Sequence, residues 1–182
     1  GKKDIGILLA KSFFCENLIE YAPCNSCKNC KRIDSGNHPD VHIVEPDGLS
    51  IKKGQIQALQ EEFSKTGVES NKKLYMIIHA DKMTVNAANS LLKFLEEPNA
   101  NTIAILITEQ YHKILNTILS RCQLISFQPL QPIAIQETLI ASGIPKHLAS
   151  LVTQLTNDTE AATQIAQDDW FAQGRLKVIK LY

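Results

Sequence analysis

Four short runs of apolar residues, separated by segments with helical periodicity, constrain the fold of this chain more than any other feature. The runs cover residues 41–44, 74–78, 103–107 and 124–127. Strands that alternate with helices are typical of a parallel sheet with covering helices. The run 103–107 is apolar at every position, as expected of a central strand that is buried on both faces. The predicted fold class is therefore α/β.

Helical patterns fill the segments between these runs. Apolar side chains recur every three or four positions over 56–63 and 85–95, and a shorter helix is expected at 114–119. Thr84 is the predicted N-cap of the 85–95 helix, and Pro98 is expected to stop it. This helix is expected to lie on the sheet.

The strand pattern ends after the fourth run. The rest of the chain predicts three or four short amphipathic helices, with a break at 143–145. Asp158 or Thr159 is the expected N-cap of a later helix, and the last helix is expected to run through Trp170 to the end. A second, all-helical domain is therefore predicted.

Composition limits the classes of function. A chain of 182 residues that is 44% hydrophobic is long enough for one core and a small satellite domain. The 19 basic and 19 acidic side chains cancel, so no global field favours nucleic acid or a membrane. No apolar run approaches the ~20 residues that a spanning helix needs. We expect a soluble cytoplasmic protein without a membrane partner.

Four of the five cysteines are spaced as C-x8-C-x2-C-x2-C. These are Cys15, Cys24, Cys27 and Cys30. Four thiolates suit tetrahedral zinc, with Zn–S bonds of about 2.3 Å, and leave no open position for water, so such a site is structural. The polar residues around them do not form a core of their own, and a metal would supply the missing folding energy. The spacing therefore predicts a structural zinc site.

Other interpretations of the cysteines remain open. Four free buried thiols fit poorly with the polar local sequence. A redox dithiol pair is a second alternative. A nucleic-acid-binding zinc knuckle is favoured by Lys28, Lys31 and Arg32, but no aromatic residue lies between them for base stacking.

The first residues, Gly1-Lys2-Lys3, resemble the end of a phosphate-binding loop. In that motif the lysine is followed by Ser or Thr, whose hydroxyl ligates magnesium, and Lys3 has no such oxygen. A strand that feeds a nucleotide-hydrolysing site would be followed by acids, but here it ends in Ile78-His79. Two magnesium-site components are missing, which predicts a scaffold that is retained without hydrolysis. A helical pattern follows the motif at Ile5, Leu8, Leu9 and Phe13.

Two further motifs identify a family. Asn89–Pro98 reads NSLLKFLEEP, and Ser120-Arg121-Cys122 follows at the predicted lip of the fourth strand. Together they resemble the clamp-loader branch of the AAA+ superfamily, and the cysteine module narrows the resemblance to bacterial DNA polymerase III. The hydrolytically competent gamma/tau chains of that family keep an Asp-Glu pair where this chain has Ile78-His79. The resemblance is therefore to the non-hydrolysing branch.

This resemblance covers nearly the whole chain and implies its domains. An AAA+ parallel sheet with covering helices, similar to a nucleotide-binding domain, is expected at 1–128, with a zinc-module insertion at about 15–37. A small all-helical lid domain is expected at 129–182. The N-terminal strand and most of the phosphate loop are expected upstream of Gly1, and the chain is expected to be a two-domain fragment.

The resemblance also implies site residues. In this family the arginine at the position of Arg121 reaches in trans into the ATP site of a neighbouring subunit, with Ser120 beside it. A rigid guanidinium fork suits the neutralisation of a transferring phosphoryl group. An ordinary surface arginine is the alternative. Thr108 matches a position that senses the γ-phosphate, or it only bonds the sheet end. Gly1 and Lys2 are the remaining nucleotide-binding candidates, for weak binding without turnover.

Several other polar residues are weaker candidates. His79 is either a replacement base or a structurally satisfied histidine that closes a buried strand. Glu96 and Glu97 stand near a helix C-terminus, where carboxylates are unfavourable to the dipole, and are candidate contacts to another subunit. Cys122 is expected to pack as a small apolar group.

The resemblance implies an interaction protein in DNA replication that is not an enzyme on its own. It would act as a stator of the polymerase III clamp loader, with the gamma/tau and delta subunits as partners, and reach the sliding clamp and primer-template DNA through the complex. Zinc is the expected cofactor, whereas the partial phosphate loop gives little support for ATP binding. The alternatives are an active gamma/tau-type ATPase and, less favoured, a zinc-dependent nucleic-acid-binding module.

Overall fold

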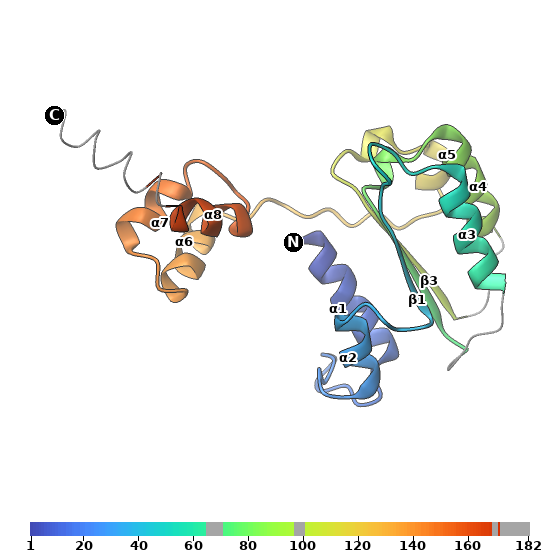
Figure 1. Ribbon diagram of the computed structural model, residues 1–182, viewed down its shortest axis with the longest axis horizontal. Helices are drawn as coiled ribbons and strands as arrows, with labels where there is room; N and C mark the ends of the chain where they lie inside the picture. Colours follow the sequence, from blue (N-terminus) through green and yellow to red (C-terminus); the bar gives the residue numbers. More distant parts are fainter. Residues whose placement is uncertain (65–70, 97–100, 169–170, 172–182) are drawn as a thin grey trace. The chain divides into compact units, whose positions relative to one another are not determined.

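The computed structural model describes residues 1–64, 71–96, 101–168 and 171. It divides into two compact units, residues 1–125 and 126–182, and each is described by itself (Figure 1). The predicted roles of Glu97, Pro98 and Trp170 fall outside the described residues. No helix in the described part is both long and apolar enough to cross a membrane.

The first unit is built on a parallel sheet. Its described strands are β1 (Val41–Val44), β2 (Lys73–Ile78) and β3 (Thr102–Ile107), in the order β1-β2-β3. Val41 lies beside Leu74, which lies beside Ile103. Among the described strands β2, not β3, is central, but the predicted cover on both faces of β3 is confirmed, because Leu106 packs in one helix layer and Ile105 in the other. Apolar side chains on both faces of a strand indicate that helices cover both faces. They do not indicate whether other strands hydrogen-bond to both of its edges.

Helices cover both faces of this sheet (Figure 1). On one face lies α1 (Lys2–Phe14), which also packs against α2 (Lys28–Asp34). On the other face lie α3 (Lys53–Ser64), α4 (Val85–Glu96) and the short α5 (Asn116–Leu119). The predicted α/β class with covering helices is confirmed, and all three helices predicted between the strands are present.

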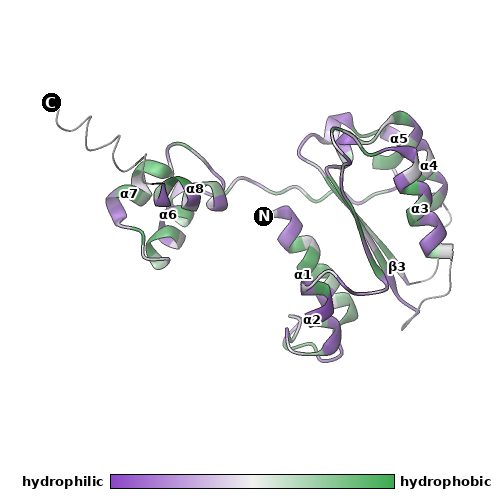
Figure 2. Ribbon diagram, viewed as in Figure 1, coloured by the Kyte–Doolittle hydropathy of each residue, from purple (hydrophilic) through white to green (hydrophobic). Residues whose placement is uncertain are grey.

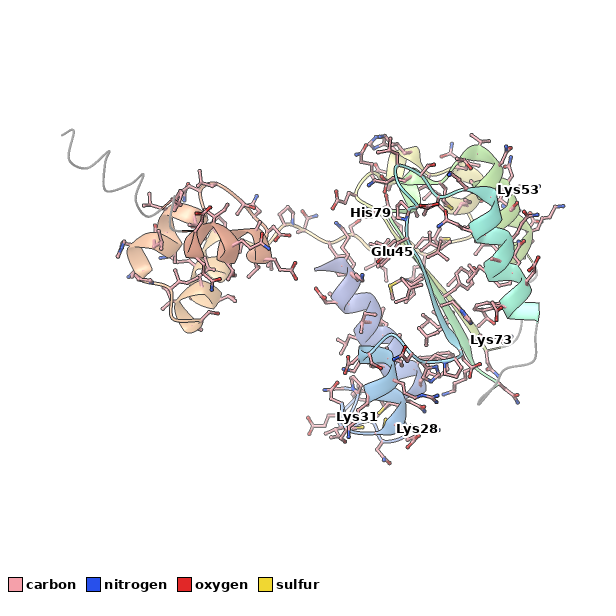
Figure 3. The ribbon with its side chains drawn as sticks, viewed as in Figure 1. Lys28, Lys31, Glu45, Lys53, Lys73 and His79 are labelled. Carbon is pink, nitrogen blue, oxygen red and sulfur yellow. The ribbon has the colours of Figure 1, made fainter. Side chains whose placement is uncertain are left out.

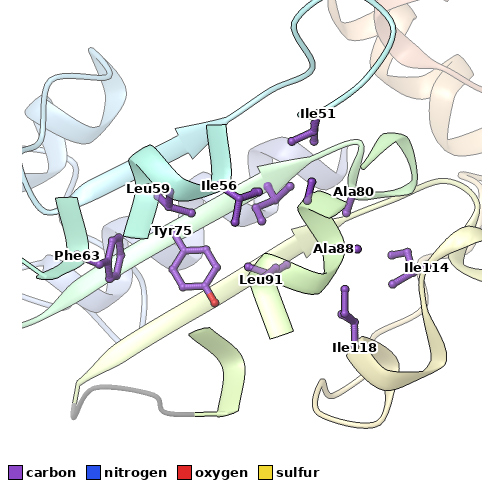
Figure 4. Close-up of a cluster of buried hydrophobic side chains, with 12 residues drawn as sticks. Ile51, Ile56, Leu59, Phe63, Tyr75, Ala80, Ala88, Leu91, Ile114 and Ile118 are labelled. Atoms are coloured by element: carbon purple, nitrogen blue, oxygen red, sulfur yellow. The ribbon is translucent and has the colours of Figure 1, made fainter. Parts of the chain in front are cut away.

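Side chains of β2 alternate between the two layers. Leu74 and Met76 pack with residues of α1, whereas Tyr75 and Ile77 pack with residues of α3 and α4. Phe63 of α3 packs edge-on against Tyr75, with 5.2 Å between ring centroids (Figure 4). Hydrophobic residues follow the strands and α4, while α2 is mostly hydrophilic (Figure 2). The core therefore lies in the sheet layer, and α2 contributes little to it.

Helix α1 approaches the sheet closely through its small residues. A Cβ atom at Gly6 would lie 2.7 Å from Met76 Cε, and Ala10 is completely buried. Ile5, Leu8 and Leu9 are 39%, 48% and 49% exposed. The apolar periodicity correctly predicted a helix here, but the side chains that carried it are not the buried ones.

The fourth predicted strand, 124–127, is absent from the structure, where this segment is extended chain without a strand partner. Leu124, Ile125 and Phe127 are 61%, 63% and 44% exposed. A strand is stabilised by the ladder that it forms with a neighbour, and no described strand pairs with this segment. The prediction of a strand at this position is wrong for the described chain.

The second unit contains three short helices among its described residues. They are α6 (Pro132–Ala141), α7 (Lys146–Val152) and α8 (Thr159–Gln167). The break at 143–145 is confirmed, with Gly143 at φ +88°, and Asp158 caps α8 by accepting a 2.8 Å hydrogen bond from the Ala161 N–H. Their shared core includes Ile135, Leu139, Val152 and Ala162. The lid assignment and the predicted boundary at 128 stay predictions.

Candidate functional site

The four clustered cysteines converge on one point. Cys15 follows the last residue of α1, Cys27 is the N-cap of α2, and Cys30 lies inside α2. Cys24 comes from the loop between the two helices, and all four sulfur atoms lie within 4.8 Å of one another. A tetrahedron of Zn–S bonds has edges of roughly 3.8 Å, so this spacing fits a tetrathiolate ion.

Backbone N–H groups point at three of these sulfurs. The N–H groups of Cys24, Cys27 and Cys30 donate to the Sγ atoms of Cys15, Cys24 and Cys27 over 3.3, 3.3 and 3.5 Å. Such bonds favour the charged thiolate, which is the form that binds metal. Only Cys30 is buried, so the alternative of four buried free thiols does not fit.

The environment shifts the pKa values of the cysteine thiols in opposite directions. Hydrogen bonds from Ser26 and from the Cys27 N–H lower the pKa of Cys24 to about 6. Backbone hydrogen bonds lower the pKa of Cys27 as well. Desolvation raises the pKa of Cys30 to about 12, which disfavours its thiolate unless a cation lies beside it. The donor set therefore suits a thiophilic cation such as zinc.

This cysteine module, residues 15–37, is anchored to α1. Lys11 Nζ lies 2.9 Å from both carboxylate oxygens of Asp34, and its side chain is only 11% exposed. Asn29 Nδ2 donates a 2.9 Å hydrogen bond to the Phe14 carbonyl, which ties α2 to the last turn of α1. Lys28 and Lys31 extend from α2 (Figure 3). The cysteine module therefore packs against α1 and is held to it by these polar contacts.

A second group of residues lies at the carboxyl edge of the sheet, where ligands bind in open parallel sheets. Glu45 and His79 mark this edge in Figure 3, at the opposite end of the strands from Lys73. Lys3 Nζ lies 2.7 Å from Glu45 Oε1, so the start of α1 lies at this edge. The Lys3 ammonium therefore occupies the position at which a phosphate-binding loop carries its magnesium-binding hydroxyl. Gly1 and Lys2 lie at the same end of α1, as N-cap and first residue.

Thr108, directly after β3, has its hydroxyl engaged. It donates a 2.7 Å hydrogen bond to Asp81 Oδ1 and accepts one of 3.0 Å from the Gln110 N–H. His79, at φ +55°, turns the chain into the 3-10 helix η1 (Ala80–Lys82), which carries Asp81 to Thr108. This geometry suits the structural alternative for Thr108, a bond at the sheet end.

Glu45 and Asp81 were missed by the sequence analysis. Glu45 directly follows β1, and Asp81 comes three residues after the end of β2. Acidic residues just after the strands were the signal that would have found them. Burial alone would raise the pKa of Asp81, but hydrogen bonds from Thr108 and from backbone N–H groups outweigh it and hold that pKa below its ordinary value.

We expect Thr108→Val to destabilise the fold by about 1 kcal/mol at neutral pH, because it removes one hydrogen bond to the Asp81 carboxylate and one from the Gln110 N–H. The pKa of Asp81 should rise, since the bond that favours its ionised form is lost. A lowered folded-state pKa contributes stability above the unfolded pKa, so the deficit should shrink as pH falls below about 4. Denaturant unfolding against pH and NMR titration of the carboxyl measure both effects.

The matched control is Thr102→Val at the other end of β3. Among the described residues, the Thr102 hydroxyl is buried without a hydrogen-bond partner. Its removal should therefore cost no stability. An equal loss in both variants would contradict the assigned role of the Thr108–Asp81 bond.

Arg121 lies in a turn after α5, not at the lip of a strand as predicted. Its Nη1 donates to the Thr117 carbonyl over 2.8 Å and lies 3.4 Å from Ser120 Oγ. Its Nη2 lies 2.7 Å from Oε1 of Glu96, at the end of α4. Ser120 Oγ donates in turn to the Thr117 carbonyl over 3.0 Å.

The structure does not bring Arg121 together with the carboxyl-edge residues. Because β2 and β3 are parallel, α4 must run back between them from the carboxyl edge towards the amino edge. Asp81 precedes α4 and Glu96 ends it, and a helix of 12 residues spans roughly 18 Å. The guanidinium therefore lies at the far end of α4 from Thr108.

Comparison with known proteins decides the family. A family model described as "DNA polymerase III, delta subunit" matches residues 1–131. This chain belongs to that family. Over 183 aligned residues it is 64% identical to DNA polymerase III subunit delta' of Bacillus subtilis, an alignment that covers 100% of this chain and 55% of the relative. It is 32% identical to the delta' subunit of Pseudomonas aeruginosa, which covers 85% of this chain and 48% of that protein.

These relatives include both delta' and tau subunits of DNA polymerase III. The tau subunit of Bacillus subtilis is 35% identical over 136 residues, 74% of this chain and 24% of that protein. Within Bacillus subtilis the chain is 64% identical to delta' and 35% identical to tau, which confirms the predicted resemblance to a DNA polymerase III subunit of the delta' kind. The chain spans about half the length of these delta' relatives.

Solved structures share the fold. A gamma subunit-related DNA polymerase III protein from Thermotoga maritima gives a TM-score of 0.51 at 21% identity, covering 72% of this chain and 46% of that one. The RuvB Holliday junction branch migration motor of Thermotoga maritima gives 0.54 at 14% identity, covering 81% and 50%. At these identities the likeness establishes the fold alone.

Proposed function

We propose that this chain is the AAA+ part of a delta'-type clamp-loader subunit that does not hydrolyse ATP itself. It supplies Arg121, with Ser120 beside it, to the ATP site of a neighbouring subunit and acts as a stator while the sliding clamp is loaded during DNA replication. The gamma/tau and delta subunits are the proposed partners. The clamp and primer-template DNA are reached through the complex.

The observation that carries this proposal is the position of Arg121. Its side chain is 37% exposed, and its guanidinium lies at the end of α4 that is remote from the chain's own carboxyl edge. An arginine so placed is unsuited to its own nucleotide edge and available to a neighbour. A permanently charged, planar fork is the group that stabilises a transferring phosphoryl group in related hydrolases.

The residues at the carboxyl edge of the sheet support the proposal that this chain does not hydrolyse ATP itself. Magnesium in nucleotide sites is held by a loop hydroxyl and strand-end acids, and these positions are Lys3, Ile78 and His79 here. Lys3 forms an ion pair with Glu45 instead. The Thr108 hydroxyl, the proposed sensor, bonds Asp81. The remaining nucleotide candidates, Gly1 and Lys2, offer a phosphate contact without a metal site.

We also propose that Cys15, Cys24, Cys27 and Cys30 hold a structural zinc ion. A four-thiolate shell leaves no position for a substrate or reactive water, so the metal contributes folding energy and no chemistry. Within the module, α2 has only seven residues, and its buried residues are Cys30 and Ile33. So small an apolar contribution favours a metal as the element that orders the module.

The purified chain is expected to hydrolyse ATP no faster than buffer, with or without Mg²⁺, because the positions that would hold the metal lack suitable oxygens. Phosphate release with a sensitive coupled assay measures this, with a gamma/tau chain as the positive control. Magnesium-dependent turnover that disappears in Lys2→Ala would establish an active motor and contradict the proposal. Turnover that survives Lys2→Ala would point to a contaminant.

A further inference from the structure

Arg121 is held by contacts within its own chain. The Thr117 carbonyl accepts from Nη1 over 2.8 Å, and Glu96 Oε1 accepts from Nη2 over 2.7 Å. The two acceptors come from different helices, α5 and α4, which pack against each other (Figure 1). The guanidinium is therefore fixed from two sides.

We infer that Glu96 is a positioning residue for Arg121, which it orients for the neighbouring subunit's ATP site. This inference rests on the proposed trans role of Arg121. The carboxylate fixes the plane of the guanidinium, and the Thr117 carbonyl fixes its height above α5. Glu96 itself touches neither nucleotide nor the reacting atoms.

The contact pattern leaves donors for a phosphate. A guanidinium carries five N–H donors. Glu96 and Thr117 accept one each, and Ser120 Oγ lies 3.4 Å from Nη1. No other contact to this group is present among the described residues, so the Nε hydrogen and one Nη2 hydrogen stay available. Two N–H groups suffice for a bidentate contact with phosphoryl oxygens.

Stability does not account for the placement of Glu96. The side chains of Glu96 and Arg121 are 50% and 37% exposed, and exposed ion pairs of this kind contribute little to folding. A carboxylate at the C-terminus of a helix is also unfavourable to the helix dipole. Glu96 contributes little to folding stability and lies at an unfavourable position of the helix. Its contact with Arg121 is therefore the better explanation for a carboxylate at this position.

The size of the effect follows from geometry. A misplacement of about 1 Å at a catalytic group costs up to about 10²-fold in rate. Thr117 still holds Arg121 when Glu96 is removed, so we expect a smaller loss. Glu96→Ala should lower the turnover number for ATP in the reconstituted clamp loader about tenfold and leave KM unchanged. Glu96→Gln keeps an acceptor oxygen, and we expect a loss of about threefold.

The test is a double-mutant cycle in the reconstituted complex with Glu96→Ala, Arg121→Ala and the double variant, measured by single-turnover ATP hydrolysis. If Glu96 acts through Arg121, the double variant should be no slower than Arg121→Ala alone. Glu137→Gln, an exposed carboxylate on α6, is the control for the loss of one negative charge and should leave the rate unchanged. Thermal melting of the variant chains checks that folding is intact.

The outcomes separate this inference from the proposed function. If Arg121→Ala slows the complex and Glu96→Ala does not, the positioning role is overturned and the trans arginine stands. If Glu96→Ala slows the double variant by its full factor, Glu96 acts elsewhere and the inference is again overturned. If Arg121→Ala has no effect, the proposed function fails and this inference with it.

Discussion

Replacing Arg121 by alanine is expected to slow ATP hydrolysis about 10³-fold at the ATP site that this subunit faces in a reconstituted clamp loader. Arginine fingers in related nucleotide hydrolases contribute about 10³ to 10⁵ in rate, because their charge is matched to the transition state rather than to bound ATP. The loss should therefore appear in the turnover number, with little change in ATP affinity.

Folding of the variant chain should be preserved. Arg121 is 37% exposed and pairs with a half-exposed Glu96, so its removal costs the fold little. Pre-steady-state phosphate release from the assembled complex measures the rate, and size-exclusion chromatography checks assembly. Arg121→Lys should recover only part of the rate, since a point charge does not replace a planar fork. An assembled complex with an unchanged rate would contradict the trans role.

Removal of a cysteine ligand is expected to have the largest effect on stability. Cys30 is completely buried and faces the other three sulfurs, so Cys30→Ala should abolish zinc binding and unfold residues 15–37. In zinc-finger peptides the metal contributes about 10 kcal/mol or more, and this module has little apolar surface to replace that contribution. Elemental analysis should find one zinc per wild-type chain and none in the variant.

Cys122→Ala is the matched control. Cys122 packs against the main core and lies outside the cluster, so the variant should keep its zinc and lose only about 1 kcal/mol of stability. Hydrogen exchange should localise the change in Cys30→Ala to the module. A metal-free wild-type chain with full protection over residues 15–37 would refute the proposed zinc site.

The sequence predicted this fold well where local pattern and burial agree. Helix α4 carried both an apolar period and a cap, and the structure confirms the cap, since Thr84 Oγ1 accepts from the Ala87 N–H over 3.3 Å. The cysteine spacing predicted a convergence that the structure reproduces within 4.8 Å. In each case the information lies within a short stretch of chain.

Prediction was poorer where the outcome depends on distant residues. Apolar side chains at 124–127 have strand propensity, but no described strand pairs with them. The period of Ile5, Leu8 and Leu9 does not reveal that close packing is achieved by Gly6 and Ala10. The periodicity shows that a helix has apolar side chains at regular positions. It does not show which face of the helix packs against the sheet.

The pairing of Arg121 with Glu96 was also beyond sequence pattern. The two residues are 25 positions apart, and the sequence offered Glu96 only as a candidate contact to another subunit. Its partner became visible only once α4 and α5 were placed together. Charge pairs between helices depend on tertiary packing, which no local period encodes.

Helix α1 has a consequence for communication within the first unit. One end carries Lys3, bound to Glu45 beside the sheet edge, and the other end passes directly into Cys15. A single helix of 13 residues therefore joins the four-cysteine cluster to the carboxyl edge of the sheet. Because Gly6 and Ala10 pack this helix closely against the sheet, we expect a displacement at the cysteine end to shift the Lys3 end as well, roughly 20 Å away along the helix.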